Sequence, residues 1–204
     1  MTMVAVSQRV AWDTQSLERR DALDQRWIRF LENCGLAPLL IPNNVSVAQK
    51  MAAGRPLVGI LLTGGNDLEA YGGDAPERDQ TELFLLEFSI RHKIPLLGVC
   101  RGMQVIQDFY GVSLSPVEGH VAPVQTIQVN GLPVAVNSFH RWGTTLTRRP
   151  LEVWAVSADG VVKAVRHQSL PIQGIMWHPE RFEPFRNQDV EWVRDFFAGV
   201  KVAV

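Results

Sequence analysis

The sequence has few cysteines, no excess of either charge and no clustered histidines. Cys34 and Cys100 are the only two cysteines among 204 residues, so we expect no disulfide framework. Two thiols without neighbouring histidines also make a poor zinc site, and we expect neither a metal nor another cofactor. The formal net charge of −1 is not concentrated in any block of like charge, which argues against a nucleic-acid partner.

Long apolar runs are missing as well. No stretch approaches the ~20 apolar residues that a membrane-spanning helix needs, and the start of the chain lacks the pattern of a secretory signal. We therefore expect a cytoplasmic protein without a membrane partner. A hydrophobic content of 46% with 20% charged residues is ordinary for a globular domain, and we interpret residues 1–204 as a single domain.

Short apolar runs alternate with helical patterns in the first half of the chain, which is typical of a parallel sheet covered by helices on both faces. The pattern predicts strands at residues 4–7, 39–41, 57–62 and 95–99 and helices at residues 17–34, 45–53, 82–92 and 102–110. Residues 113–175 read as several strands with turns such as Asn130-Gly131, before a last helix at residues 188–198. We interpret this order as a doubly wound α/β fold, with an active site at the carboxyl ends of the strands.

Cys100 follows a predicted apolar strand and is flanked by Gly98 and Gly102, which is the spacing of a nucleophile elbow. The turn from strand to helix is so tight in an elbow that side chains at the flanking positions would collide. The following helix directs its positive end at the sulfur and favours the thiolate. A buried apolar cysteine would also explain Cys100, but the two glycines favour a nucleophile. Cys34 has no such context and is expected in the core.

A thiolate nucleophile needs a base, and His178-Pro179-Glu180 follows another predicted apolar strand. Side chains at positions i and i+2 of an extended segment project to the same side, so the carboxylate of Glu180 can hold the imidazole of His178 in one tautomer. The tripeptide alone fits a surface turn equally well. Together with the elbow, it predicts a base and its orienting partner.

Acyl transfer also needs N–H donors for the developing oxyanion. Thr63-Gly64-Gly65-Asn66 ends the third predicted strand, and glycines there would let backbone N–H groups approach a substrate carbonyl closely. We assign these donors to the N–H of Gly65 and to the N–H of Arg101, the residue after the nucleophile. A Gly-Gly pair is usually only a turn, so the assignment depends on the neighbouring motifs.

Four motifs stand in one order along the chain: Thr-Gly-Gly-Asn-Asp at 63–67, Gly-Val-Cys-Arg-Gly-Met-Gln at 98–104, Val-Asn-Ser-Phe-His at 136–140 and Trp-His-Pro-Glu at 177–180. With these motifs, residues 57–182 resemble class I glutamine amidotransferase domains, and among them the free-standing γ-glutamyl hydrolases. The resemblance implies a flavodoxin-like, mostly parallel sheet and cleavage of a γ-glutamyl amide bond in a small-molecule substrate. It implies Cys100 as the nucleophile, His178 as the base and Glu180 as its partner.

Further substrate contacts are implied only by this resemblance. Gln104 and the segment Ser138-Phe139 would hold the α-amino and α-carboxylate ends of the glutamyl group. Gly64, Asn137 and His140 would line the same site. On physical grounds alone, His140 is equally well an ordinary polar loop residue.

The opening of the chain, residues 6–27, departs from γ-aminobutyrate hydrolases. It is similar to hydrolases that act on γ-glutamyl-CDP-amidate in surface-polysaccharide phosphoramidate synthesis. A leaving group with a diphosphate needs cations near the thiol, and six arginines lie at predicted strand ends and motif loops: Arg9, Arg19, Arg20, Arg101, Arg141 and Arg181. We expect Arg9 and Arg141 to clamp the diphosphate, with Arg101 and Arg181 on the same rim. Each arginine also fits a solvated surface position.

Three functions fit these residues. The first is a free-standing hydrolase in which water resolves a γ-glutamyl thioester on Cys100, with γ-glutamyl-CDP-amidate as the preferred substrate and γ-glutamyl-γ-aminobutyrate as the alternative. The second is a glutaminase subunit that delivers ammonia to a separate synthase partner. The third is a non-catalytic binding protein of the same fold, and the complete set of catalytic groups argues against it.

Overall fold

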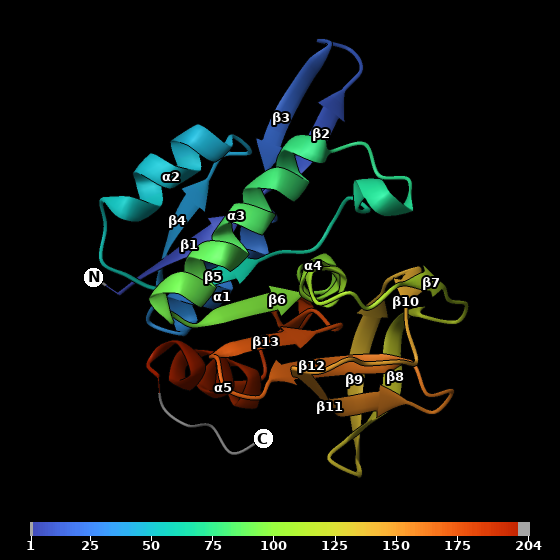
Figure 1. The fold of residues 1–204 in the computed structure, drawn as a ribbon. Helices are drawn as coiled ribbons and strands as arrows, with labels where there is room; N and C mark the ends of the chain where they lie inside the picture. The colour runs from blue at the N-terminus through green and yellow to red at the C-terminus, as the bar shows by residue number, and fades with distance from the viewer. Residues whose placement is uncertain (1, 200–204) are drawn as a thin grey trace.

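The computed structural model describes residues 2–199, and its elements surround one nine-stranded sheet (Figure 1). The strand order is β4-β1-β5-β6-β13-β12-β11-β8-β9. These strands are β1 (Met3–Ser7), β4 (Ala37–Ile41), β5 (Leu57–Leu62), β6 (Leu96–Val99), β8 (Val121–Val129), β9 (Leu132–Phe139), β11 (Leu151–Ser157), β12 (Val162–His167) and β13 (Ile172–Ile175). Two short pairs stand apart, β2 (Arg9–Asp13) with β3 (Glu18–Ala22) and β7 (Ser115–Pro116) with β10 (Trp142–Gly143).

The first half of the sheet is parallel. Strand β1 pairs with β4 and β5, β5 pairs with β6, and β6 pairs with β13. These strands are short and apolar because both of their faces are covered. Val4 and Val6 belong to the apolar cluster on one face and Ala5 to the cluster on the other, as alternation along a strand requires.

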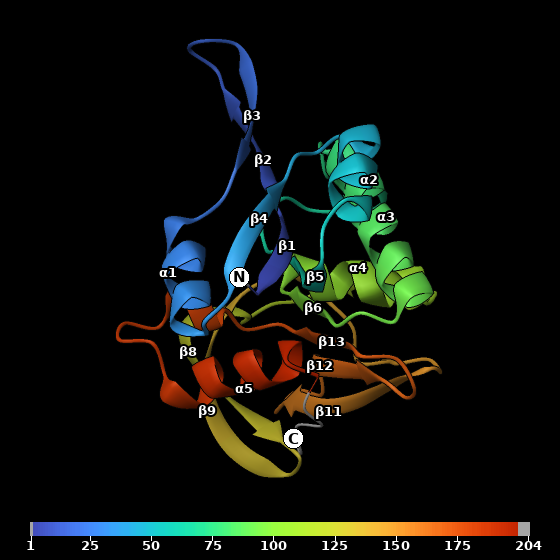
Figure 2. The same cartoon turned by 90° about the vertical axis from the view of Figure 1, so that its left-hand side faces the viewer.

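Helices cover both faces of this parallel half (Figure 2). Helices α1 (Gln25–Asn33) and α5 (Asn187–Phe197) pack on one face, and α2 (Val45–Ala53), α3 (Pro76–His92) and α4 (Arg101–Phe109) pack on the other. Two 3-10 turns complete the elements, η1 (Glu69–Tyr71) and η2 (Pro179–Arg181). None of the helices within residues 2–199 has the length and apolarity needed to cross a bilayer. The predicted doubly wound α/β fold is confirmed.

The second half of the sheet is antiparallel. Strand β13 joins the halves, since it pairs in parallel with β6 and antiparallel with β12. The antiparallel order continues through β11 and β8 to β9. Asn130 (φ 48°) and Gly131 (φ 81°) turn β8 into β9 in the left-handed conformations that a two-residue hairpin loop uses. This extension carries the carboxyl end of β9 to the site described below.

The helix predicted at residues 17–34 is wrong in its first part. Residues 9–22 form the hairpin β2–β3, which projects from the body of the molecule (Figures 1 and 2), and α1 begins only at Gln25. Leu17 turns the hairpin at φ 56°, and the Asp24 side chain caps α1 by accepting from the Arg26 N–H. The apolar spacing that indicates a helix starts only at Leu23. The helix predicted at residues 82–92 begins too late, because α3 starts at Pro76.

Candidate active site

Cys100 lies in the sharp turn between β6 and α4, with φ 54° and ψ −105°. A non-glycine residue in such a conformation stores about 1–3 kcal/mol of strain, which the surrounding structure must hold. A Cβ at Gly98 would lie 2.5 Å from the Gly102 backbone, and a Cβ at Gly102 would lie 2.2 Å from the Leu62 carbonyl oxygen. Both glycines are therefore required by the close passage of β6, β5 and α4. The geometry is that of an elbow that holds the thiol at the carboxyl end of the parallel strands.

His178 and Glu180 form a buried pair just after β13. The Nδ1 atom of His178 lies 2.7 Å from Oε1 of Glu180, and the two side chains are 2% and 1% exposed. Burial alone would lower the pKa of His178, but the charges of Glu180 and Cys100 outweigh it and raise the pKa to about 9. The Nε2 atom is buried and has no hydrogen-bond partner within residues 2–199. A protonated imidazole with one free N–H beside the thiol is thus the expected state.

Gly64 and Phe139 pack against both the thiol of Cys100 and the imidazole of His178. A Cβ at Gly64 would lie 2.8 Å from Cε1 of His178 and 3.5 Å from Cβ of Cys100, so only glycine fits between them. The Sγ atom of Cys100 lies 4.0 Å from the carbonyl oxygen of Phe139. The Phe139 ring stands edge-on to the imidazole, with centroids 5.9 Å apart. The motifs that carry Gly64, Cys100, Phe139 and His178 are thereby brought together.

The side chain of Asn137 binds protein backbone. Its Nδ2 donates to the carbonyl of His178 at 2.9 Å, and its Oδ1 accepts from the N–H of His178 at 2.8 Å. The turn at His178 has left the sheet, so its backbone needs partners that the neighbouring strands do not supply. The contacts in the structure are those of a residue that positions His178, and the expected contact of this carboxamide with substrate stays a prediction.

Two hollows open beside the Cys100–His178 pair, the larger one lined by Cys100 and the smaller one by His178. The larger has a volume of about 370 Å³ and is lined by Cys100, Gln104, Phe139, His140 and Arg141, among others. The smaller, about 30 Å³, has room for about one water and is lined by residues that include Arg9, Gly64, His178 and Arg181. Gly65, at φ 88°, lines both.

The arginines expected on one rim do not share it. Arg9 and Arg181 line the smaller hollow, whereas Arg141 lines the larger one. The guanidinium of Arg101 is 1% exposed and pairs with Asp79 and Glu82, because the elbow turns this side chain toward α3. Its side chain is excluded as a rim cation, while its backbone N–H keeps the position next to the thiol.

Arg19 and Arg20 are also committed elsewhere. They lie on β3 of the projecting hairpin, where Arg19 pairs with Glu77 and Arg20 pairs with Asp13 and Glu18. Both lie within the helix predicted at residues 17–34, and their position on a projecting hairpin instead removes them from the thiol. The base of the hairpin is different, since the carboxamide of Asn66 pairs with both backbone groups of Val10 at 2.9 and 3.0 Å. This contact holds Arg9 over Gly65.

A buried lysine that the sequence interpretation missed supports the end of β9. The ammonium of Lys163 lies 2.8 Å from Nδ1 of His120, 3.1 Å from Oγ of Ser138 and 2.7 Å from Nε2 of His140. Burial lowers the pKa of Lys163 to about 8. Burial and the lysine charge together lower the pKa of His140 to about 3, so this ring is neutral. The available signal was a charged residue between apolar neighbours, in the run Val161-Val162-Lys163-Ala164-Val165.

The side chains at the end of β9 that were expected to bind substrate make hydrogen bonds within the protein. The Ser138 hydroxyl donates to the His120 carbonyl at 2.8 Å, and Nδ1 of His140 lies 2.9 Å from the Trp142 carbonyl. The Nε2 of Gln104 donates to the same carbonyl at 3.0 Å, and Gln104 lines the larger hollow. Within residues 2–199, no group of three or more His, Cys, Asp and Glu side chains is placed to hold a metal.

Comparisons with known proteins agree with this arrangement. A model of the family described as Peptidase C26 matches residues 2–131 and 120–180. A γ-glutamyl-CDP-amidate hydrolase of Campylobacter jejuni is 28% identical over 201 residues, which cover 97% of this chain and 98% of that protein. A γ-glutamyl-γ-aminobutyrate hydrolase of Escherichia coli O157:H7 is 29% identical over 198 residues, which cover 78% of each. The glutaminase domain of Trypanosoma brucei CTPS has the same fold, with a TM-score of 0.73 at 14% identity over 100% of this chain and 96% of that one.

Proposed function

Because this chain belongs to the Peptidase C26 family and is a hydrolase of γ-glutamyl amides, we propose that it works through a γ-glutamyl thioester on Cys100. The observation that carries the proposal is the buried His178–Glu180 pair, 2.7 Å apart, beside the thiol of a strained elbow. A structural cysteine needs neither the strain nor the buried charge, and both are features of a nucleophile with its base.

The thiolate of Cys100 attacks the γ-carbonyl carbon of the substrate. The carbonyl electrons move to its oxygen, which accepts hydrogen bonds from the N–H groups of Gly65 and Arg101. When the C–N bond breaks, Nε2 of His178 gives its proton to the leaving nitrogen. The neutral imidazole then takes a proton from water, whose oxygen attacks the thioester carbon. The C–S bond breaks, which restores the thiolate beside the protonated imidazole, and the released γ-carboxylic acid of glutamate loses its proton to solvent. Glu180 stays ionised and supports the imidazolium throughout.

The larger hollow is proposed as the glutamyl pocket. Its 370 Å³ exceed what a glutamyl group fills, and it opens directly on Cys100. The oxygen of the Gln104 carboxamide is the acceptor for the α-ammonium, since Nε2 of the same group is already bound. Arg141 lies in this hollow and is the cation for the α-carboxylate.

The leaving group is proposed to pass over the smaller hollow. His178 must reach the leaving nitrogen, and it lines this hollow together with Arg9 and Arg181. At about 30 Å³ the hollow itself holds no nucleotide, so a large leaving group must extend across its mouth toward the base of the β2–β3 hairpin. Two arginines there fit a diphosphate, which supports γ-glutamyl-CDP-amidate as the substrate. We propose that the reaction takes place in the cytoplasm and supplies phosphoramidate to surface-polysaccharide synthesis.

A substrate panel tests the proposal. The isolated protein is assayed with L-glutamine, γ-glutamyl-γ-aminobutyrate and γ-glutamyl-CDP-amidate, and kcat/KM is compared. A kcat/KM at least tenfold higher for the nucleotide substrate supports the proposal as a whole. A higher kcat/KM for γ-glutamyl-γ-aminobutyrate would be consistent with the thioester mechanism but would exclude CDP-amidate as the natural leaving group. Glutamine hydrolysis that appears only with an added synthase would instead indicate an ammonia-delivering subunit.

A further inference from the structure

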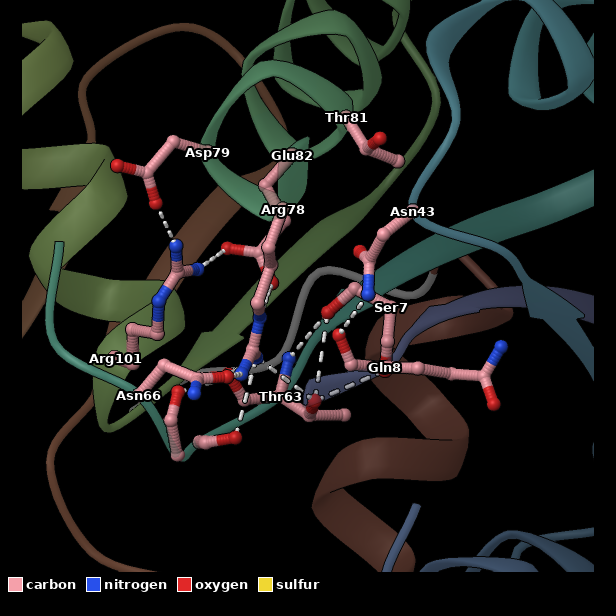
Figure 3. Close-up of polar contacts among 12 residues, drawn as sticks. Ser7, Gln8, Asn43, Thr63, Asn66, Arg78, Asp79, Thr81, Glu82 and Arg101 are labelled. Carbon is pink, nitrogen blue, oxygen red and sulfur yellow. Dashed lines mark hydrogen bonds and ion pairs between the residues drawn. The ribbon is translucent and has the colours of Figure 1, made fainter. Parts of the chain in front are cut away.

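A buried arginine on α3 binds the loop that carries Gly65. The side chain of Arg78 is fully buried, and it donates to the carbonyl oxygens of three successive residues, Thr63 at 2.8 Å, Gly64 at 3.1 Å and Gly65 (Figure 3). It also donates to the side-chain oxygens of Thr63 and Asn66. An arginine whose donors bind consecutive carbonyls fixes the peptide planes of that loop.

These contacts determine where the Gly65 N–H points. The Gly64–Gly65 peptide is planar, and in a trans peptide the N–H lies opposite the carbonyl oxygen. Because Arg78 holds the Gly64 oxygen on the α3 side, the Gly65 N–H is directed to the opposite side. A Cβ built on Gly64 would touch His178 and Cys100, so that side of the loop faces the catalytic pair.

Glu82 connects this arginine with the residue that carries the second donor. Its Oε1 accepts from Nε of Arg78 at 2.9 Å, and its Oε2 accepts from the guanidinium of Arg101 (Figure 3). Asp79 accepts from the other end of the Arg101 guanidinium. Although burial opposes the charge, Arg101 and Arg78 keep the pKa of Glu82 below its usual range. One carboxylate thus ties the Gly65 loop and the first residue of α4 to the same turn of α3.

We propose that Arg78 and Glu82 are positioning residues for the oxyanion site, holding the N–H groups of Gly65 and Arg101 at a fixed mutual distance and direction. The inference rests on the proposed thioester mechanism for its kinetic consequence, but the geometry it asserts stands without a substrate. Neither side chain touches the substrate. Their contribution is preorganisation, since donors held in place need no rearrangement when the oxyanion forms.

The kinetic test uses Arg78→Lys and Glu82→Gln, with Arg91→Lys as a control on the exposed surface of α3. Lysine keeps the charge but cannot bind three carbonyls, and glutamine keeps the shape but loses the charge. With the best substrate of the panel, kcat should fall by about 10²-fold while KM changes less than threefold, as for loss of one oxyanion donor. The rate of Cys100 alkylation by iodoacetamide should stay within threefold, because the thiol and its base are untouched. The control should match the wild type.

A transition-state mimic and a structure separate positioning from folding. L-glutamate γ-semialdehyde forms a hemithioacetal whose oxygen occupies the oxyanion site, so its inhibition constant should rise in both variants while that of L-glutamate does not. Crystal structures of the two variants should show the Gly64–Gly65 peptide rotated. An unrotated peptide in both would overturn the inference, even if the wild type hydrolyses nothing in the panel. Inhibition constants that rose by the same factor for the aldehyde and for L-glutamate in folded variants would also overturn it.

Discussion

The carboxamide of Asn137 binds the backbone of His178 at both ends, with hydrogen bonds of 2.9 Å to the carbonyl and 2.8 Å from the N–H. The two residues are 41 positions apart and come from different halves of the sheet. Strand β9 of the antiparallel half therefore holds His178, the proposed base, near Cys100, the proposed nucleophile on the parallel half. The antiparallel extension thus forms part of the candidate site, because it supplies both this contact and the Phe139 carbonyl near the thiol.

The first prediction concerns the nucleophile. Cys100→Ala should abolish hydrolysis and leave the fold intact, because no other group in the elbow can form the thioester. Activity against the best panel substrate is measured together with the circular dichroism spectrum. More than a few per cent of residual activity in a folded variant would remove Cys100 from the mechanism.

Alkylation should distinguish the two thiols. Burial raises the pKa of Cys34 to about 12, whereas Cys100 lines the larger hollow and lies beside His178, whose pKa is raised to about 9. Limited treatment with iodoacetamide at pH 7 should modify Cys100 first, and mass mapping of the peptides identifies the site. Earlier modification of Cys34 would contradict the prediction.

The base and its partner should differ in importance and in pH dependence. His178→Ala should lower kcat roughly 10²–10⁴-fold, whereas Glu180→Gln should be milder because it keeps an orienting hydrogen bond. In the wild type, kcat/KM should fall as the pH rises through about 9, where the imidazolium loses the proton needed by the leaving nitrogen. Glu180→Gln should move this limb to lower pH, since the carboxylate raises the pKa of His178. An unchanged limb would mean that another group sets it.

Local sequence was sufficient for the catalytic elements and insufficient for what surrounds them. The glycines at −2 and +2 of Cys100 indicated an elbow, and the structure shows the backbone contacts that require them. The His-Pro-Glu tripeptide similarly indicated the pairing of His178 with Glu180. Both depend on residues at most two positions away. Their catalytic roles stay predictions until the variants are assayed.

The supporting residues depend on contacts between distant segments. Arg78 and Glu82 have the i, i+4 spacing of a helical pair, but the predicted helix began at residue 82 and left Arg78 outside it. Lys163 contacts residues 23 to 43 positions away, which no local pattern reveals. The hairpin at residues 9–22 was missed because strand β3, Glu-Arg-Arg-Asp-Ala, has no apolar alternation. Its packing against Glu77 and Asn66 comes from the tertiary fold.

Lys163 should make stability depend on pH in the alkaline range. Its pKa is about 8 in the folded protein and about 10.5 when unfolded, so the unfolded chain binds more protons between these values. The free energy of unfolding should therefore gain about 2–3 kcal/mol from this group as the pH rises from 8 to 10.5. In Lys163→Met this gain should be missing. His120, His140 and Asp159 surround the group, so the comparison is made between variants at each pH rather than across pH alone.

Urea unfolding at pH 7.5, 9 and 10.5 measures this contribution. Lys50→Met is the matched control, because Lys50 is an exposed residue of α2, and this variant should retain the wild-type pH dependence of the unfolding free energy. If the free energy of unfolding changed with pH by the same amount in the wild type and in Lys163→Met, the lysine would keep its ordinary pKa in the folded state.

The last prediction separates the two arginines that were expected to act together. Arg9 lines the hollow on the His178 side and Arg141 lines the hollow with Gln104, so they should affect different parts of the substrate. Arg9→Ala should cost about 1.5–3 kcal/mol in kcat/KM for γ-glutamyl-CDP-amidate, the range for a charge-assisted hydrogen bond, and little for glutamine. Arg141→Ala should reduce kcat/KM for both substrates by a similar factor. Arg20→Ala, a hairpin arginine paired with Asp13 and Glu18, serves as the control. If Arg9→Ala lowered kcat/KM equally for both substrates, the diphosphate would not bind at the hairpin base. If Arg141→Ala lowered kcat/KM for γ-glutamyl-CDP-amidate alone, the diphosphate would bind in the larger hollow and the assignments of the two hollows would be reversed.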